Sequence, residues 1–322
     1  MKYVAIVFVV LTVVGTLFAL SISLDSPKKI GISTWGSNED YQLNLQGFQD
    51  ALKSEFGDEG IEFIIKNPNA DKLSQLNIVK DFDKQNVDLV YTLTTPGTKI
   101  AQEMLNKKPI VFSSVTFPVE AKIVDSMKSS KNNLVGTSNY IDAEEQIKKI
   151  TENTDVKNLA FVHRTHEINS MIQLSLFENY LEKYQISLTE VPASNLEELE
   201  ERVNFVIDSV DGVYLACDTL IQTGGDIIAI NIATENKKPS FSCVKSGVEN
   251  GAVFGIVADN YRLGYESGLK AVQILNGEHP SNIQSSFPEI QTIIVNKEAA
   301  ELFEMNFEGI DTDLEYVGVL EK

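Results

Sequence analysis

The feature that most constrains the fold of this chain is a pattern that occurs twice. The tetrapeptide Asn-Lys-Lys-Pro precedes a short apolar run in NKKPIVFSSV (residues 106–115) and again in NKKPSFSCV (residues 236–244). A similar lead-in stands before each copy, DLVY at residues 88–91 and DGVY at residues 211–214. An internal repeat of this kind predicts two halves built on one plan. Because single cores stop growing near about 250–300 residues, a chain of 322 residues is expected to form two domains.

Short β-rich apolar runs alternate with amphipathic helical stretches from Lys29 onward. Residues 41–56, for example, place Leu45, Phe48 and Leu52 on one helical face. Such alternation predicts βαβ units and parallel sheets, with each Asn-Lys-Lys-Pro as a helix-to-strand loop. We expect strands at residues 30–33, 61–66, 89–93, 109–113, 159–162, 186–190, 213–216, 240–242 and 291–295. We expect helices at residues 41–56, 72–84, 170–184, 196–210, 225–234 and 260–276 and from Lys297.

Composition excludes several classes of protein. A total of 46 Asp and Glu against 27 Lys and Arg gives a net charge of −19, which repels phosphate backbones, so no nucleic-acid partner is expected. The chain has no Gly-x-Ser-x-Gly elbow, no Walker loop and no GxGxxG after a strand, so we expect neither an enzyme nor a bound cofactor.

The N-terminus carries a long uncharged run at residues 4–24. At about 1.5 Å per helical residue this run is long enough to cross a hydrocarbon core of about 30 Å. Residues 1–27 are therefore expected to form a hydrophobic helix that anchors the chain, or alternatively a signal peptide cleaved near Ala19-Leu20-Ser21. Either interpretation places the rest of the chain outside the cytoplasm, at the cell surface or in the periplasm.

The two cysteines, Cys217 and Cys243, each follow a predicted strand at corresponding sheet ends. Buried free thiols are the favoured interpretation, and a disulfide remains open in an oxidising compartment.

Polar turns follow the predicted strands, where open parallel sheets bind their ligands. In the turn Thr94-Thr95-Pro96-Gly97, we expect Thr95 to cap a helix and Pro96 to take its first position. Free amides and the helix dipole make such a turn suitable for a carboxylate, and a plain helix cap is the alternative.

Three further turns carry candidate ligand contacts. Trp35 follows the first strand and could stack on a ligand ring, or could pack in the core. Asp218 and Asp259 follow strands of different halves and could hold a ligand ammonium, or could cap helices. His163, His166 and Glu167 suggest a metal, but their spacing matches no zinc-protease motif, so no metal site is expected.

The order of these motifs resembles the tryptophan/tyrosine-type substrate-binding proteins of ABC importers, which have the type I periplasmic-binding fold. The resemblance is carried by GFQDAL (47–52), VDLVYTLTTPGTKIAQ (87–102), KKPIVFSSVTFPVEAKIV (107–124), NLVGTSNYIDAEEQI (133–147), EINS (167–170), VYLACDTLI (213–221), GIVADNYRLGYESG (255–268) and TIIVNKEAA (292–300).

This resemblance implies an α/β fold of two doubly wound parallel-sheet lobes joined by a multi-strand hinge. The N-terminal lobe would comprise residues 28–136 and 258–284, and the C-terminal lobe residues 137–257 and 285–322. By position, the family's ligand contacts fall on Thr95, Pro96, Thr116, Asn169, Ser170, Asp218 and Thr219. The chain departs from the family pattern at Phe117, at Asn139 and at His163-Arg164, three turns that face the other lobe.

The resemblance implies an exported, monomeric solute-binding protein that closes on a small carboxylate-bearing ligand and delivers it to an ABC permease. The simplest such ligand is an amino acid, with aromatic amino acids among the candidates. Trp35 and Phe117 would enclose the ligand side chain. The candidate ligand contacts are Trp35, Thr94, Thr95, Pro96, Thr116, Phe117, Asn169, Ser170, Asp218, Thr219, Ser242 and Asp259, with no catalytic residue. A sensor for a membrane signalling partner and a metal enzyme built on His163, His166 and Glu167 are the alternatives.

Overall fold

Both copies of the repeated tetrapeptide lie between a helix and a strand. The first connects α4 (Thr95–Met104) to β4 (Ile110–Ser113), and the second connects α9 (Gly225–Glu235) to β9 (Ser240–Ser242). The computed structural model describes residues 26–287, 291–305, 307 and 314–317. The apolar run at residues 4–24, on which the anchor prediction rests, lies outside this part of the chain. Among the described residues, no helix is both long enough and apolar enough to cross a membrane.

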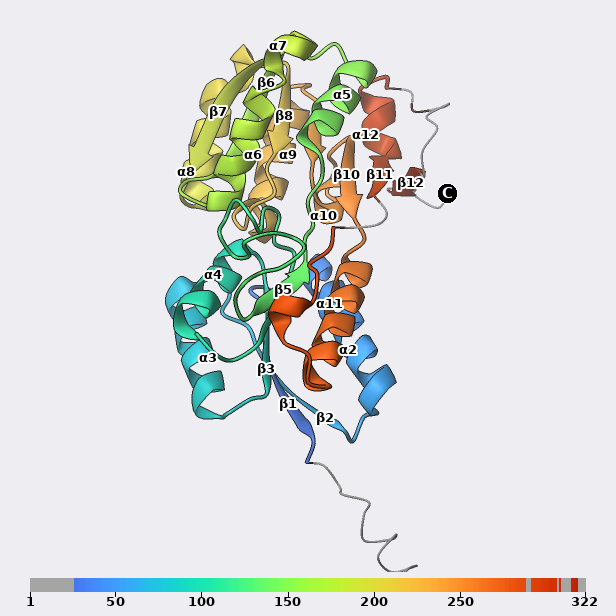
Figure 1. Cartoon of the computed structure of the whole chain (residues 1–322). Coiled ribbons are helices and arrows are strands. Elements are labelled where there is room, and N and C mark those ends of the chain that lie inside the picture. The colour runs from blue at the N-terminus through green and yellow to red at the C-terminus, as the bar shows by residue number, and fades with distance from the viewer. Residues whose placement is uncertain (1–25, 288–290, 306, 308–313, 318–322) are drawn as a thin grey trace, which may run out of the picture.

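The chain forms two lobes, one above the other in Figure 1, and each is built on one sheet. The N-terminal lobe has five parallel strands in the order β2-β1-β3-β4-β5. Besides α4 and β4 it contains β1 (Lys28–Ser33), α2 (Glu39–Phe56), β2 (Ile61–Lys66), α3 (Lys72–Lys84), β3 (Leu89–Leu93), β5 (Leu134–Thr137), α11 (Asn260–Leu275) and a 3₁₀ turn, η3 (Pro280–Asn282).

The C-terminal lobe has seven strands in the order β12-β11-β10-β9-β8-β6-β7. Besides α9 and β9 it contains α5 (Ala143–Asn153), β6 (Asn158–Arg164), α6 (Ile168–Glu178), α7 (Leu181–Tyr184), β7 (Ser187–Ala193), α8 (Leu196–Val206), η1 (Ile207–Ser209), β8 (Gly212–Leu215), η2 (Ile221–Thr223), α10 (Lys245–Glu249), β10 (Phe254–Ala258), β11 (Gln291–Asn296), α12 (Lys297–Leu302) and β12 (Leu314–Val317). The strands are parallel except that β11 runs antiparallel to β10.

The chain passes between the lobes three times: after β5, after β10 and after η3. The first and third passages lie side by side, since Thr137 and Ser286 form a parallel bridge. Lys270 on α11 ties them together, because its Nζ donates to Thr137 Oγ1 at 3.2 Å and to Ser286 Oγ at 2.9 Å. Burial lowers the pKa of Lys270 to about 8.

Helix α11 returns to the N-terminal lobe and packs along α2. The two backbones meet at two glycines that leave no room for a side chain. A Cβ on Gly47 would lie 2.0 Å from the carbonyl oxygen of Tyr261, and one on Gly264 would lie 1.9 Å from that of Asn44. Glycine at these two positions therefore allows the backbone of α11, which follows the second passage, to lie directly against α2 in the N-terminal lobe.

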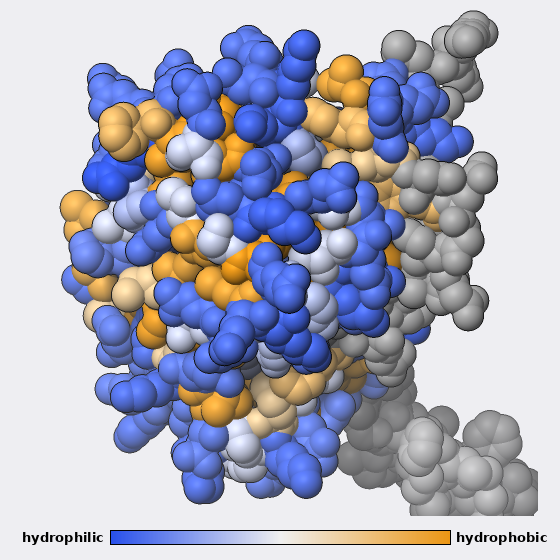
Figure 2. Space-filling model, turned by 90° about the horizontal axis from the view of Figure 1, so that it is seen from above, coloured by the Kyte–Doolittle hydropathy of each residue, from blue (hydrophilic) through white to orange (hydrophobic). Residues whose placement is uncertain are grey.

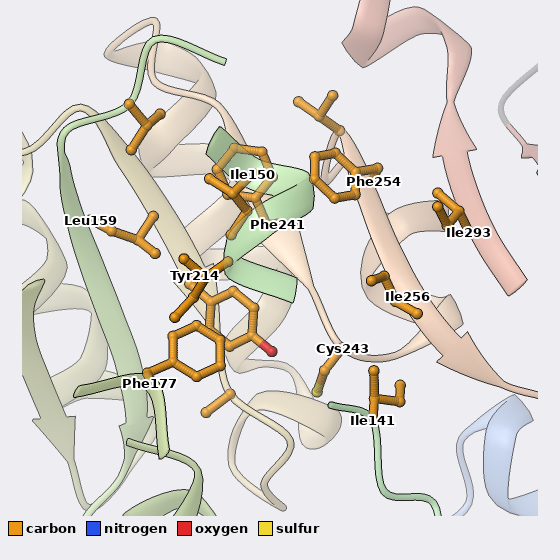
Figure 3. Packing of buried hydrophobic residues seen from close by; sticks show 14 of the residues in the cluster. Ile141, Ile150, Leu159, Phe177, Tyr214, Phe241, Cys243, Phe254, Ile256 and Ile293 are labelled. Carbon is orange, nitrogen blue, oxygen red and sulfur yellow. The ribbon is translucent and has the colours of Figure 1, made fainter. Parts of the chain in front are cut away.

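Separate cores stabilise the lobes. In the N-terminal lobe Phe48 stacks on Tyr91 with ring centroids 3.7 Å apart. In the C-terminal lobe Phe177 and Tyr214 pack against each other within a cluster of aliphatic and aromatic side chains, with Cys243 at one end of the cluster (Figure 3). Toward solvent, the outer end of this lobe presents hydrophilic side chains around smaller hydrophobic patches (Figure 2).

The cysteine expectation needs correction. Cys217 and Cys243 are joined in a disulfide whose Cα atoms are 5.6 Å apart, within the usual range for such bonds, rather than present as free thiols. The bond ties together the carboxyl ends of the neighbouring strands β8 and β9.

Candidate functional site

Three turns at the carboxyl ends of the N-terminal strands have unusual backbone conformations. Trp35 after β1, Thr94 after β3 and Ser114 after β4 have φ values of 63°, 69° and 54°. Thr94, with ψ at 158°, is the most unusual because its side chain is β-branched. Residues held this way cost about 1–3 kcal/mol each and cluster at functional sites. Three of them at one end of a sheet mark this end as the place to look for a ligand.

The turn after β3 presents the start of α4. Thr94, rather than Thr95 as expected, is the N-cap, and its Oγ1 accepts from the Gly97 amide at 3.4 Å. Pro96 therefore takes the second helical position. The first-turn amides have no partners within the helix, and the dipole is positive here. A Cβ on Gly97 would lie 3.1 Å from Trp35 Cε3, so the indole packs against this turn.

The facing wall, in the C-terminal lobe, contains two buried carboxyl groups. Glu167 accepts from the Thr219 amide at 3.0 Å and from Thr219 Oγ1 at 2.5 Å. Asp218 accepts from the Arg164 amide at 2.6 Å and from the amides of Leu220 and Ile221, each at 3.0 Å. Asp218 therefore fixes its own turn, the capping role that the sequence left open.

Burial raises the pKa of both carboxyl groups. For Asp218, burial and then the negative charge of Glu167 raise the pKa to about 7. For Glu167, burial outweighs the lowering effect of the hydrogen bonds from Thr219 and of the Arg164 guanidinium. A positive charge placed beside these two carboxyl groups would favour their ionised form and so act against the effect of burial.

Three buried polar atoms at these turns lack protein partners. They are Trp35 Nε1, Asn139 Oδ1 on the first passage between lobes, and Asn169 Oδ1 in the first turn of α6. Among the described residues only Ser240 Oγ shares this property. A buried unsatisfied group costs about 1–3 kcal/mol, so each needs a physical reason. Trp35, Asn139 and Asn169 thus leave one donor and two acceptors without a protein partner.

The remaining predicted residues either lie beside the first passage between the lobes or already have structural partners. Thr116 and Phe117 are buried beside the first passage, where the Thr116 carbonyl accepts from Ser138 Oγ at 3.0 Å and Phe117 meets Tyr140 edge-on with centroids 5.6 Å apart.

Three other candidates have structural partners. Ser170 Oγ donates to the Glu167 carbonyl at 3.1 Å, and Ser242 Oγ donates to the Val244 carbonyl at 3.1 Å. Asp259 is exposed, and its carboxylate caps α11. The structure does not bring Asp259 to the wall formed by Glu167 and Asp218.

The His163 and His166 region has no metal-binding geometry. His163 is buried, with Nε2 2.9 Å from Glu190 Oε1, whereas His166 is exposed. The Glu167 carboxylate already accepts hydrogen bonds from Thr219. Over the described part of the chain, no three His, Cys, Asp or Glu side chains gather as metal ligands would.

Sequence reasoning missed three residues of this region. Tyr41, in the first turn of α2, is buried and lies within electrostatic reach of Glu167 and Asp218. Glu167 entered only as a metal ligand, and Asn139 only as a departure from a motif. The sequence offered one signal for the buried carboxyl groups: Glu167 stands two residues before the Asn169-Ser170 pair.

Comparisons with known proteins agree on the type of molecule. A family model described as "ABC transporter substrate binding protein" matches residues 29–308. The chain is 27% identical over 281 residues to a tyrosine-binding protein of Clostridioides difficile, covering 86% of this chain and 81% of that protein. It is similar in fold to an ABC domain from Streptococcus pneumonia in complex with L-Trp, with a TM-score of 0.86, 24% identity and coverage of 91% and 100% of the two chains.

A third comparison is with the ligand-free, open structure of a substrate-binding protein with adhesive properties from Clostridium difficile. That likeness has a TM-score of 0.70, 25% identity and coverage of 90% of this chain and 99% of the other.

Proposed function

The chain belongs to the family of ABC transporter substrate-binding proteins, and we propose that it captures an aromatic amino acid outside the cytoplasm and delivers it to an ABC permease. The observation that carries the proposal is the set of three unpartnered polar atoms, because they come from both lobes and from the passage between them. A ligand that satisfies all three must offer at least two hydrogen-bond donors and one acceptor. A free amino acid has both in its ammonium and carboxylate groups.

The carboxylate is assigned to the start of α4. Amides in the first turn of a helix and the positive end of its dipole stabilise an anion. Trp35 packs on this turn, and its Nε1 supplies a further donor that the protein leaves unused. Thr94, Thr95 and Pro96 hold this turn in place, and the strained conformation of Thr94 keeps it preorganised.

The ammonium is assigned to the opposite wall. Asn139 and Asn169 each offer a buried amide oxygen without a partner. Glu167 and Asp218 lie behind Asn169, since Asn169 Nδ2 donates at 2.5 Å to the carbonyl of Cys217, the residue before Asp218. In their ionised form these carboxyl groups stabilise a cation there even though their oxygens already accept protein hydrogen bonds.

The side chain is assigned to the apolar surface of Trp35 and Phe117. Both rings are buried at turns of the N-terminal lobe. An aromatic side chain suits this surface through stacking and edge-to-face contact. The tyrosine-binding relative and the L-Trp-bound neighbour support an aromatic ligand.

Capture is proposed to occur by hinge closure about the three passages. Family membership, the two lobes and the hydrogen bonds between them support this mechanism. The export expected from residues 4–24 places the protein where a permease could receive the ligand, with the protein acting as a monomer.

The proposal is tested by calorimetry on protein that has been stripped of ligand by unfolding and refolding. L-tyrosine, L-tryptophan and L-phenylalanine are compared with tyramine and tryptamine, which lack the carboxylate, and with indole-3-propionate, which lacks the ammonium. We expect stoichiometric binding of one or more of the amino acids and at least about 10-fold weaker binding of each one-ended analogue, because a lost charged hydrogen bond costs about 1.5–3 kcal/mol. Equal affinity for an amino acid and its amine would remove the carboxylate assignment.

A further inference from the structure

Three hydrogen bonds join the two lobes directly. Asn38 Nδ2 donates to the carbonyl oxygen of Gln222 at 3.0 Å, and the Tyr41 hydroxyl donates to Gln222 Oε1. Ser246 Oγ, on α10, donates to Asp40 Oδ2 at 3.2 Å. Residues 38–41 form the first turn of α2 in one lobe, whereas Gln222 and Ser246 belong to the other. Figure 1 places α10 at the lower edge of the upper lobe, facing α2.

These contacts are well placed to act on the hinge equilibrium. Tyr41 is 2% exposed and Asp40 is 5% exposed, so both bonds are shielded from water while the lobes touch. Separating the lobes breaks all three bonds together. Burial, and then the nearby carboxyls of Glu167, Asp40 and Asp218, raise the pKa of Tyr41, so its hydroxyl stays protonated and able to donate.

We propose that Gln222 is a positioning residue for lobe closure, and that its bonds to Asn38 and Tyr41 form a latch that sets how much of the protein is closed before any ligand arrives. This inference rests on the proposed function as a solute-binding protein. A ligand that binds only the closed form has an apparent dissociation constant equal to the intrinsic one divided by the closed fraction. The latch therefore strengthens the binding of every ligand by one common factor and does not choose among them.

The cleanest perturbation of the latch is Tyr41→Phe, because it removes the hydroxyl and keeps the buried ring. A neutral hydrogen bond contributes about 0.5–1.5 kcal/mol, so affinity should fall by at most about 2- to 12-fold, with faster ligand dissociation. The fall should be the same for L-tyrosine, L-tryptophan and L-phenylalanine. Gln222→Ala should act in the same direction, and the double variant should lose less than the sum of the two single changes.

Tyr261→Phe is the matched control. The Tyr261 hydroxyl donates to Asp50 Oδ2 at 3.1 Å, a bond between α11 and α2 inside one lobe. This variant also loses one tyrosine hydroxyl bond, but no contact between the lobes. It should leave affinity and dissociation rate unchanged.

Small-angle X-ray scattering of the ligand-free full-length protein provides a readout that does not depend on binding. Tyr41→Phe and Gln222→Ala should increase the radius of gyration relative to the wild type and Tyr261→Phe. This result supports the latch even if none of the three amino acids binds. Failure of the latch proposal can therefore be told apart from failure of the proposed ligand. Unchanged scattering would overturn the proposal, and so would a loss of affinity confined to one of the three amino acids, because Tyr41 would then be a ligand contact.

Discussion

Replacing Asn139 with leucine should separate stability from ligand binding. The amide oxygen of Asn139 is buried without a partner, so the ligand-free protein bears its desolvation cost, about 1–3 kcal/mol. Leucine has nearly the same size and no polar atom. We therefore expect the free energy of unfolding of the ligand-free protein to stay constant or to rise by about 1 kcal/mol, or about 2 °C in Tm.

The same change should weaken binding. If the amide oxygen accepts from a ligand ammonium, losing that charged hydrogen bond costs about 1.5–3 kcal/mol, or about 10- to 150-fold in affinity. Calorimetry with L-tyrosine and L-tryptophan measures the affinity, and thermal unfolding of stripped protein measures the stability. Opposite effects on the two quantities are the signature of a group held for a ligand.

Asn133→Leu is the matched control for this prediction. Asn133 is also half-buried, but its Nδ2 donates to the carbonyls of Leu105 and Lys108, each at 2.6 Å. Its replacement should lower stability by about 1–3 kcal/mol and leave affinity unchanged. If Asn139→Leu instead destabilised the ligand-free protein and left affinity intact, Asn139 would be a structural residue and the ammonium assignment would be wrong.

Four further predictions concern Thr94, Asp218, the disulfide and the contact between α2 and α11. Thr94→Gly should leave the free energy of unfolding unchanged or raise it by about 1 kcal/mol, since glycine accepts a φ of 69°. Ligand affinity should fall, because the side chain no longer holds the turn. Urea unfolding measures the first effect and calorimetry the second. The pKa of about 7 for Asp218 means that, between about pH 4 and 7, the folded ligand-free protein holds a proton that the unfolded chain has released. The free energy of unfolding should therefore fall by up to about 1.4 kcal/mol per pH unit as pH rises through this window and level off above it, while affinity for an ammonium ligand rises. Unfolding and binding that do not depend on pH would contradict this. Cys217→Ala together with Cys243→Ala should cost about 2–4 kcal/mol, because the bond closes a sequence separation of 26 residues, and an unchanged Tm would count against a structural role. Gly264→Ala should destabilise by at least about 1–3 kcal/mol in denaturant unfolding, because its Cβ would lie 1.9 Å from the backbone of α2; wild-type stability would show that the helices can move apart.

Much of the fold could be predicted because local sequence signals agree with it. The bounds of β2, α3 and β9 match expectation, since each is delimited by a polar turn or a capping residue such as Asp71. The short strand β5 was missed, because four residues with a glycine at the third position give little periodicity. The antiparallel direction of β11 could not be read either, since strand direction depends on where the chain re-enters the lobe.

The candidate site was harder to predict for a physical reason. Whether Asn139 and Asn169 have partners depends on the packing of three distant segments, which spacing does not encode. The position of the α4 cap was wrong by one residue, because Thr94 takes a backbone conformation that β-branched residues rarely adopt. Asp218 and Asp259 looked equivalent as carboxylates after strands, but one is buried against Glu167 and the other is exposed.

The most direct test uses Trp35, which is the only tryptophan in the chain. Its emission is followed while stripped protein is titrated with L-tyrosine and, separately, with tyramine. The proposed site predicts a saturable change with L-tyrosine at one ligand per protein, a much weaker response to tyramine, and a loss of the L-tyrosine response at the same concentrations in Asn139→Leu. Equal responses to the two compounds, or none to L-tyrosine, would contradict the claim that the protein recognises both ends of an aromatic amino acid.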